Sequence, residues 1–204
     1  TLKGGDGNDT LTVDSGNDAL IGGGGIDTAS YATATAGVSA NLASATASDG
    51  GGGTDSLATI ENLIGSAHTD TLTGDGQNNI LDGGGSTDTL IGGAGDDTLN
   101  GGAQFDALYG GADNDVINAG DGGDHVQGDA GNDTLNGEGG NDWMLGGDGN
   151  DIINGGAGRD RMFGHDGDDT LFGGAAEDRM EGGAGSDTFV YQDISDRGDT
   201  ISDF

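Results

Sequence analysis

Two stretches, GGAGDDTLN (92–100) and GGDGNDIIN (146–154), decide the fold of this 204-residue chain. Each begins with two glycines, carries aspartate at its sixth position and places a large apolar residue at its eighth. The nine-residue unit recurs fourteen times over 65–190 without insertion or deletion, and the sixth residue is aspartate in every unit except the one that holds Asn79. A disordered glycine-rich spacer has no reason to keep this register, so the repeat predicts an ordered stack of similar turns.

The eighth position of the repeat predicts the core. A single apolar residue between two outward-facing neighbours is the pattern of a short, half-buried strand. The residues at this position are Leu72, Leu81, Leu90, Leu99, Leu108, Ile117, Val126, Leu135, Met144, Ile153, Met162, Leu171, Met180 and Phe189.

The repeat divides the chain into four segments. Three further units form a short block over residues 1–30, and the fourteen units form the main roll over 65–190. Residues 31–64 break the register, because the 43 residues from Gly22 to Gly65 are not a multiple of nine. We expect 31–64 to be a strand-rich insert that joins two roll segments and holds no site, and 191–204 to be the start of a truncated capping segment.

Composition limits the partners of this chain. It has 48 glycines, no proline, 31% hydrophobic residues and a formal charge of −32, so a compact state repels itself unless cations bind it. Nucleic acid and anionic membranes are therefore poor partners. The absence of cysteine excludes disulfides and thiolate metal sites. No apolar run approaches the roughly 20 residues of a membrane span.

The unit resembles the nonapeptide of the RTX (repeats-in-toxin), hemolysin-type calcium-binding family, and this resemblance covers about four-fifths of the chain. It implies an all-β, right-handed parallel β-roll in which the first six residues of a unit form a turn, the last three form a strand, and two units complete one coil. Similar modules occur at the C-termini of serralysin-like exoproteins and as the R-modules of alginate (mannuronan C5) epimerases. The phrase IENLIGS (60–66) also resembles stretches that lie between repeat blocks in RTX proteins.

The cofactor that the repeat predicts is calcium, in several ions. Glycines let backbone carbonyls point at an ion, aspartates add hard anionic oxygens, and all-oxygen ligation selects calcium over zinc or copper. Units 18 residues apart stack on one edge of the roll, so each site is shared between two coils. The predicted ligands are Asp9, Asp18, Asp27, Asp70, Asp88, Asp97, Asp106, Asp115, Asp124, Asp133, Asp142, Asp151, Asp160, Asp169, Asp178 and Asp187.

The two edges of the roll are predicted to differ in occupancy. On the edge that starts at Gly74, five of seven fourth positions are glycine, against three of seven on the edge that starts at Gly65. We therefore expect an ordered calcium ladder on the first edge and weaker sites on the second, around Asp70, Asp88 and Asp106. Loss of charge at Asn79 should weaken its site.

One outward-facing column differs from the plain Thr and Asn columns of the opposite sheet. At the seventh position of alternate units it holds His125, Trp143, Arg161 and Arg179, and the ninth position on the same sheet carries Tyr109, Leu145 and Phe163. Aromatic rings stack on sugars and guanidinium groups pair with carboxylates, so this column could bind an acidic polysaccharide. The alternative is that these outward positions vary freely and the arginines offset local acidity.

No catalytic motif accompanies the repeats. The three histidines fall at unrelated positions, and the sequence has no HExxH motif, serine elbow or phosphate-binding loop. We therefore expect a non-catalytic module that leaves the cell through a type I secretion apparatus, folds on calcium outside, and stabilises or presents a larger extracellular protein. The alternatives are an acidic-polysaccharide (alginate-type) binding module and an adhesin repeat.

Overall fold

The computed structural model describes residues 1–191 and 198–202 and consists of two β-sheets. The described residues form no helix, and so none that could cross a membrane. Sheet A has thirteen strands in the order β1 (Leu2–Asp6), β3 (Ala19–Gly24), β7 (Thr54–Ala58), β6 (Thr46–Ser48), β5 (Ser39–Asn41), β9 (Thr71–Thr73), β11 (Thr89–Ala94), β13 (Ala107–Ala112), β15 (His125–Ala130), β17 (Trp143–Asp148), β19 (Arg161–Asp166), β21 (Arg179–Ala184) and β23 (Thr200–Ile201). Sheet B has ten, in the order β2 (Thr10–Thr12), β4 (Thr28–Ser30), β8 (Asn62–Ile64), β10 (Ile80–Gly85), β12 (Thr98–Ala103), β14 (Val116–Gly122), β16 (Thr134–Gly140), β18 (Ile152–Ala157), β20 (Thr170–Ala175) and β22 (Thr188–Val190).

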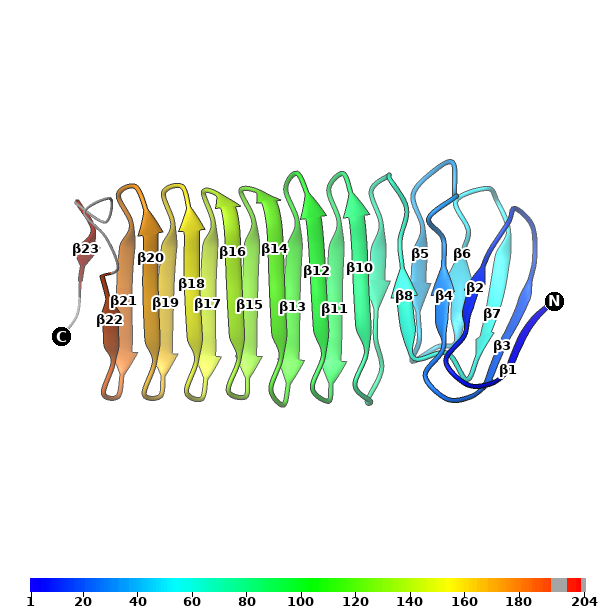
Figure 1. Ribbon diagram of the computed structural model, residues 1–204, viewed down its shortest axis with the longest axis horizontal. Coiled ribbons are helices and arrows are strands. Elements are labelled where there is room, and N and C mark those ends of the chain that lie inside the picture. The colour runs from blue at the N-terminus through cyan, green and yellow to red at the C-terminus, as the bar shows by residue number, and fades with distance from the viewer. Residues whose placement is uncertain (192–197, 203–204) are drawn as a thin grey trace.

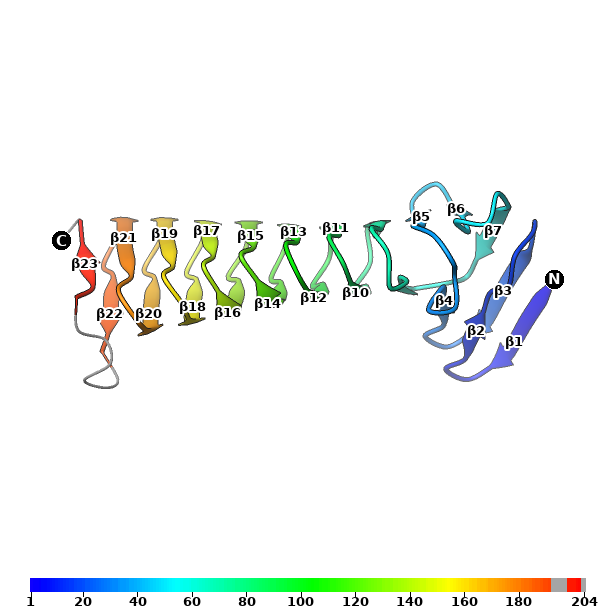
Figure 2. The same ribbon diagram turned by 90° about the horizontal axis from the view of Figure 1, so that it is seen from above.

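The chain winds between the two sheets as a parallel β-roll. From β9 to β22, successive strands alternate between sheet A and sheet B, so two nine-residue units make one coil (Figures 1 and 2). Each strand pairs in parallel with the strand 18 residues away, as Leu99 does with Leu81 and Ile117. The predicted fold class, with two units in each coil, is confirmed.

The core is a double row of eighth-position side chains enclosed between the sheets. From Leu72 to Met180 each of them has no exposed surface, and Phe189 at the end is partly buried. The interior is only one side chain deep from each sheet. Hydrophobic burial is therefore small for a chain of this length.

The strands are longer than the resemblance implied, and the expected six-residue turn was wrong. Strands such as β12 and β13 run for six residues, across the boundary between units, from the seventh position of one unit to the third of the next. Burial alternates along them, with the eighth position and the following first-position glycine both facing inward. Pairing between coils continues at the second and third positions of the next unit, as it does between Gly102 and Gly120, so the turn is shorter than six residues.

The turns use positive φ angles whether or not glycine is present. Gly95 at a fourth position has a φ of +100°, and Ala176 at the equivalent position of another unit has a φ of +104°. The conformation is strained for a residue with a Cβ.

We expect Ala176→Gly to stabilise the folded chain by about 1 kcal/mol, because it removes this strain and only part of the gain is lost to the more flexible unfolded chain. Ala175→Gly is the matched control, since Ala175 lies at the end of β20 and is absent from the positive-φ residues. That change should destabilise by about 0.5–1 kcal/mol. The test is the denaturant midpoint of each variant relative to that of the unaltered chain. Shifts of the same sign in the two variants would contradict the prediction.

The insert is part of both sheets. β5 and β6 form an antiparallel hairpin, and β6 also pairs antiparallel with β7, so sheet A contains two antiparallel joins between its parallel regions. β8 pairs in parallel with β4 on one side and β10 on the other, so sheet B continues without interruption. The first coils tilt away from the line of the main roll (Figure 2).

The predicted capping segment lies partly outside the described residues. Residues 192–197 and 203–204 are not described. In the described part, β23 adds one more parallel strand to sheet A by pairing with β21.

Candidate cation site and outer face

The sixth-position aspartates lie inside the turns. From Asp70 to Asp178 their residues are at most 3% exposed. One carboxylate oxygen, Oδ1, accepts the backbone N–H of the sixth-position residue one coil earlier, at 2.7 to 3.1 Å. These bonds link the coils into two lines of carboxylates, one along each edge of the roll.

The second oxygen of most of these carboxylates is buried and unsatisfied. Within the described residues, Oδ2 has no hydrogen-bond partner in thirteen aspartates, and a buried charge without a partner is costly. They are Asp9, Asp27, Asp55, Asp88, Asp97, Asp106, Asp115, Asp124, Asp133, Asp142, Asp151, Asp160 and Asp169.

These free oxygens share a space with backbone carbonyls. A Cβ added to Gly128 would overlap Oδ2 of Asp133, in the same unit, and would come close to the carbonyl oxygen of Gly146, one coil on. The same pair of neighbours recurs at Gly110 and at Gly146. The first-position glycine therefore leaves room where two kinds of hard oxygen converge and no donor is present, which is the environment of a cation such as calcium.

Burial raises the pKa of these carboxyl groups. Burial, together with the smaller effect of neighbouring aspartates, raises the pKa of Asp106, Asp115, Asp142 and Asp151 to about 7, although the backbone N–H bond to Oδ1 acts in the opposite direction. For the same reasons the pKa of Asp88, Asp97 and Asp160 rises to about 6. Without a cation, the folded state therefore holds charges that it stabilises poorly.

A cation held here would depend on the backbone. No group of three or more histidine or acidic side chains that could hold a metal ion occurs in the part of the chain that the structure describes. Carboxylates from the line and carbonyls from the turns would have to provide the ligands together.

A few predicted ligands differ from the rest. Both carboxylate oxygens of Asp70 accept hydrogen bonds, from Ser66 and from the N–H of Val38. The side-chain oxygen of Asn79 accepts a hydrogen bond from the backbone N–H of Asp75, and its side-chain nitrogen donates one to the backbone carbonyl of Glu61. Asp18 and Asp187 are half-buried, at the two ends of the roll.

Two carboxylates in these lines were missed in the sequence. Oδ1 of Asp55 accepts the N–H of Asp18 at 2.8 Å, and Oε2 of Glu61 accepts the N–H of Asp27 at 2.7 Å, as sixth-position residues do elsewhere. The carbonyl of Thr59 approaches Gly22 as a first-position carbonyl does in the main roll. The signal was present, because GGGGTDSLA (50–58) fits the nonapeptide in a shifted register.

The outer face of sheet A gathers the predicted polysaccharide column. His125, Trp143, Arg161 and Arg179 are paired in sequence on the adjacent strands β15, β17, β19 and β21. The ninth-position rings of Tyr109 and Phe163 lie beside this column, as the repeat predicted, and the structure adds the ring of His165. Tyr109, Phe163 and His165 extend it, with neighbouring ring centroids 5.8 to 6.4 Å apart along the row Tyr109, His125, Trp143, Phe163 and His165.

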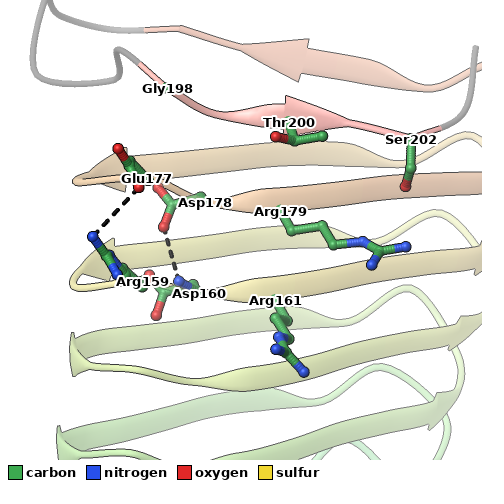
Figure 3. Close-up of a pocket in the computed structure, with 9 residues that line it drawn as sticks. All are labelled: Arg159, Asp160, Arg161, Glu177, Asp178, Arg179, Gly198, Thr200 and Ser202. Carbon is green, nitrogen blue, oxygen red and sulfur yellow. Dashed lines mark hydrogen bonds and ion pairs between the residues drawn. The ribbon is translucent and has the colours of Figure 1, made fainter.

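A shallow hollow of about 630 Å³ lies at the C-terminal end of this row, between β19, β21 and β23 (Figure 3). Arg159, Arg161 and Arg179 line it. Arg159 pairs with Glu177 at 3.4 Å and Arg179 with Glu181 at 3.5 Å, and all four side chains are well exposed. The hollow is therefore mixed in charge, because Asp160, Glu177 and Asp178 line it beside the arginines.

A parallel roll whose turns hold lines of buried, unsatisfied carboxylates beside backbone carbonyls defines a cation-binding repeat module. The chain belongs to the RTX calcium-binding nonapeptide repeat family. The family model, which spans four copies of the repeat, matches residues 1–29, 64–99, 91–126, 118–153, 127–162 and 154–189. The protein is thus an RTX calcium-binding β-roll module, and most of the insert lies outside the matched segments.

The other comparisons are distant. No curated protein matches the chain significantly. Among solved structures, it is similar to a hyperactive, Ca²⁺-dependent, β-helical antifreeze protein from an Antarctic bacterium, with 19% identity and a TM-score of 0.47. The match covers 98% of this chain and 65% of that one, so this chain spans less than two-thirds of the length of the antifreeze chain.

Proposed function

We propose that this module folds when calcium binds to its two lines of carboxylates, after secretion, and that it then stabilises or presents a larger extracellular protein. The observation that carries the proposal is the set of thirteen buried Oδ2 atoms with no partner. Each needs a positive charge, and a divalent cation between two coils supplies it to two carboxylates at once.

The secretion step follows from the same energetics. In a calcium-poor cytosol the carboxylates would remain unneutralised and the chain would stay unfolded, which suits passage through a type I secretion apparatus. Calcium outside the cell then drives folding by mass action. Membership of the RTX calcium-binding family supports this sequence of events. The proposed role is non-catalytic.

The predicted ligand set is extended to Asp55 and Glu61, with the carbonyl of Thr59. These residues continue the carboxylate lines through the insert, and Oδ2 of Asp55 is one of the unsatisfied atoms. We therefore propose that calcium sites also occur in the insert, where none was expected from the sequence.

Unequal occupancy of the edges remains part of the proposal. Asp70 already has hydrogen-bond partners for both oxygens, which supports a weak site there. The edge through Asp97 is reinforced by its fifth positions, whose side-chain oxygens accept the backbone N–H one coil further on. This outer ladder runs through Asn78, Asp96, Asn114, Asn132, Asn150, Asp168 and Ser186.

We expect Asp133→Asn to bind at least one calcium ion fewer than the unaltered chain, because the amide cannot neutralise the ion that Oδ2 faces. Native mass spectrometry of the folded protein would count the ions. Asp148→Asn is the matched control, since Asp148 is exposed at the end of β17 and belongs to neither line. An equal ion count in both variants and the unaltered chain would refute the assignment of Asp133.

A second candidate function is the binding of an acidic polysaccharide on the outer face of sheet A. The observation that favours it is the row of rings that ends at three arginines. An adhesin repeat is the remaining alternative, and no particular residue favours it.

A further inference from the structure

The outer face of sheet A has an exposed apolar centre. The rings carried by β13, β15, β17 and β19 form a ring row across this face. Trp143 is 45% exposed, and its ring centroid lies 6.4 Å from that of His125 and 6.0 Å from that of Phe163. Leu145, in the middle of β17, is only half-buried. An apolar patch with a polar rim is typical of an interaction surface.

Acidic side chains lie at one side of the rings, where the strands end. Asp148 and Asp166 are the last residues of β17 and β19, and they stand directly opposite one another in the ladder. With Asp129 of β15 they line a hollow of about 460 Å³. Like charges directly opposite one another destabilise a sheet, and neither Asp148 nor Asp166 makes an ion pair with a described residue. This side of the face therefore favours a positively charged partner.

Arginines lie at the other side, where the strands begin. Arg161 and Arg179 are the first residues of β19 and β21, and they also stand opposite one another (Figure 3). The Arg161 guanidinium makes no ion pair with a residue that the structure describes. Arg179 has one exposed pair, with Glu181 at 3.5 Å, and exposed pairs contribute little. This side of the face therefore favours a negatively charged partner.

The face is thus complementary to itself. Leu145 and Phe163 lie midway between the arginines at the strand starts and the aspartates at the strand ends. A two-fold axis that is parallel to the face and runs roughly along the roll reverses the strand direction. It therefore places the strand starts of one copy over the strand ends of another. A closed two-fold dimer requires such a self-complementary patch.

We propose that two copies of this chain associate through the outer face of sheet A as a two-fold dimer. The rings of Trp143 and Phe163 from both copies lie at its centre, and the arginine pair of each copy binds the aspartate pair of the other. A basic peptide or an acidic polysaccharide would match only one of the two charged sides. The dimer is separate from the calcium proposal, and it is an alternative to the polysaccharide function because it covers the same rings.

The size of the face predicts a weak dimer. The five strands from β13 to β21 cover about 24 Å by 20 Å at ordinary strand spacings. Stable interfaces bury about 800 Å² on each partner, so this one is small. Each chain also carries a formal charge of −32, which bound calcium lowers and salt screens. We therefore expect a dissociation constant of about 10–100 µM in saturating calcium and moderate salt.

Sedimentation equilibrium of the calcium-loaded chain tests the dimer directly. Between about 1 µM and 300 µM the average mass should rise from that of one chain towards that of two. Trp143 is the only tryptophan, so its emission should shift to shorter wavelength over the same range as its ring becomes buried.

Charge reversal gives the sharper test. Asp148→Lys/Asp166→Lys makes the chain less negative, so it would strengthen any association that overall charge alone limits. In the proposed dimer the new lysines instead face arginines, and dimerisation should weaken about tenfold or more. Arg161→Glu/Arg179→Glu should weaken it similarly. An equimolar mixture of the two variants should restore association, because each charged side again meets its opposite.

The matched control lies on the other face of the roll. Asn136→Lys/Asn154→Lys adds positive charge to β16 and β18 of sheet B and should not weaken the dimer. Circular dichroism and the calcium count of every variant show whether it is folded.

Three results would overturn the proposal. These are a single-chain mass at every concentration, equal association of Asp148→Lys/Asp166→Lys and the unaltered chain, or a mixture of the two charge-reversed variants that stays monomeric. Each leaves the calcium proposal intact, because the calcium count is measured separately on the same samples. Conversely, folding without calcium would overturn only the calcium proposal, since association is measured on folded chain.

Discussion

In a calcium chelator the chain is expected to lose its far-UV β-sheet signal, and millimolar calcium is expected to restore it. The reason is that the interior provides one buried apolar side chain per unit, while each unit also buries a carboxylate with an unsatisfied oxygen. Two lines of such charges run through a chain whose formal charge is −32. We therefore expect calcium to complete the core, so that its binding free energy is linked directly to folding.

Magnesium is the control for this experiment. It neutralises charge equally, but it requires a smaller octahedral site and gives up its water reluctantly, so it should restore much less of the signal at the same concentration. Full restoration by magnesium would show that screening alone is sufficient. A β signal that persists in chelator would contradict the requirement for calcium altogether.

The calcium requirement is expected to depend strongly on pH. In the folded chain without cations the pKa of Asp106, Asp115, Asp142 and Asp151 is about 7, above the value of 3.8 for a free aspartate. Between about pH 4 and pH 7 the folded state then holds more protons than the unfolded state. The cation-free fold is therefore most stable below about pH 4 and loses that stability as the pH rises through 7.

Above about pH 5 the unfolded chain and the calcium-loaded fold both keep these carboxylates ionised, whereas protons stabilise the cation-free fold, so the midpoint calcium concentration for folding should fall between pH 7.5 and pH 5.5. Circular dichroism during calcium titrations would measure it, after calcium is removed by dialysis, since chelators themselves weaken in acid. In the dialysed protein the β signal should also increase from pH 8 to pH 4.5. Equal midpoints at the two pH values would show that the carboxylates are not buried as described.

The sequence predicted the regular part of this molecule well, because the regularity is local. An aspartate and an apolar residue spaced by nine define both the inward side chain and the turn, so Leu99 and Asp97 could be placed without knowing the rest of the chain. The outward column of His125, Trp143, Arg161 and Arg179 follows from the 18-residue coil in the same way.

Other features could not be read from that spacing. Asp55 and Glu61 join the carboxylate lines because strand pairing across the insert, rather than sequence distance, brings them to the edge. The strands are longer than expected because pairing between coils continues at the second and third positions of the next unit, even though the second-position glycine has a positive φ. His165 extends the ring row from the second position of its unit, which the sequence did not mark as part of an aromatic column.

The antiparallel hairpin of β5 and β6 has a consequence for assembly. Because the coils are so similar, a strand could pair with the wrong coil during folding. A register shift of 18 residues would still place leucine against leucine and aspartate against aspartate. The hairpin differs from the repeats in its pairing. Its strand β5 pairs with β9, and its strand β6 pairs antiparallel with β7. The hairpin therefore fixes the register of the coils on either side of it, so that a chain of nearly identical repeats has a single native alignment.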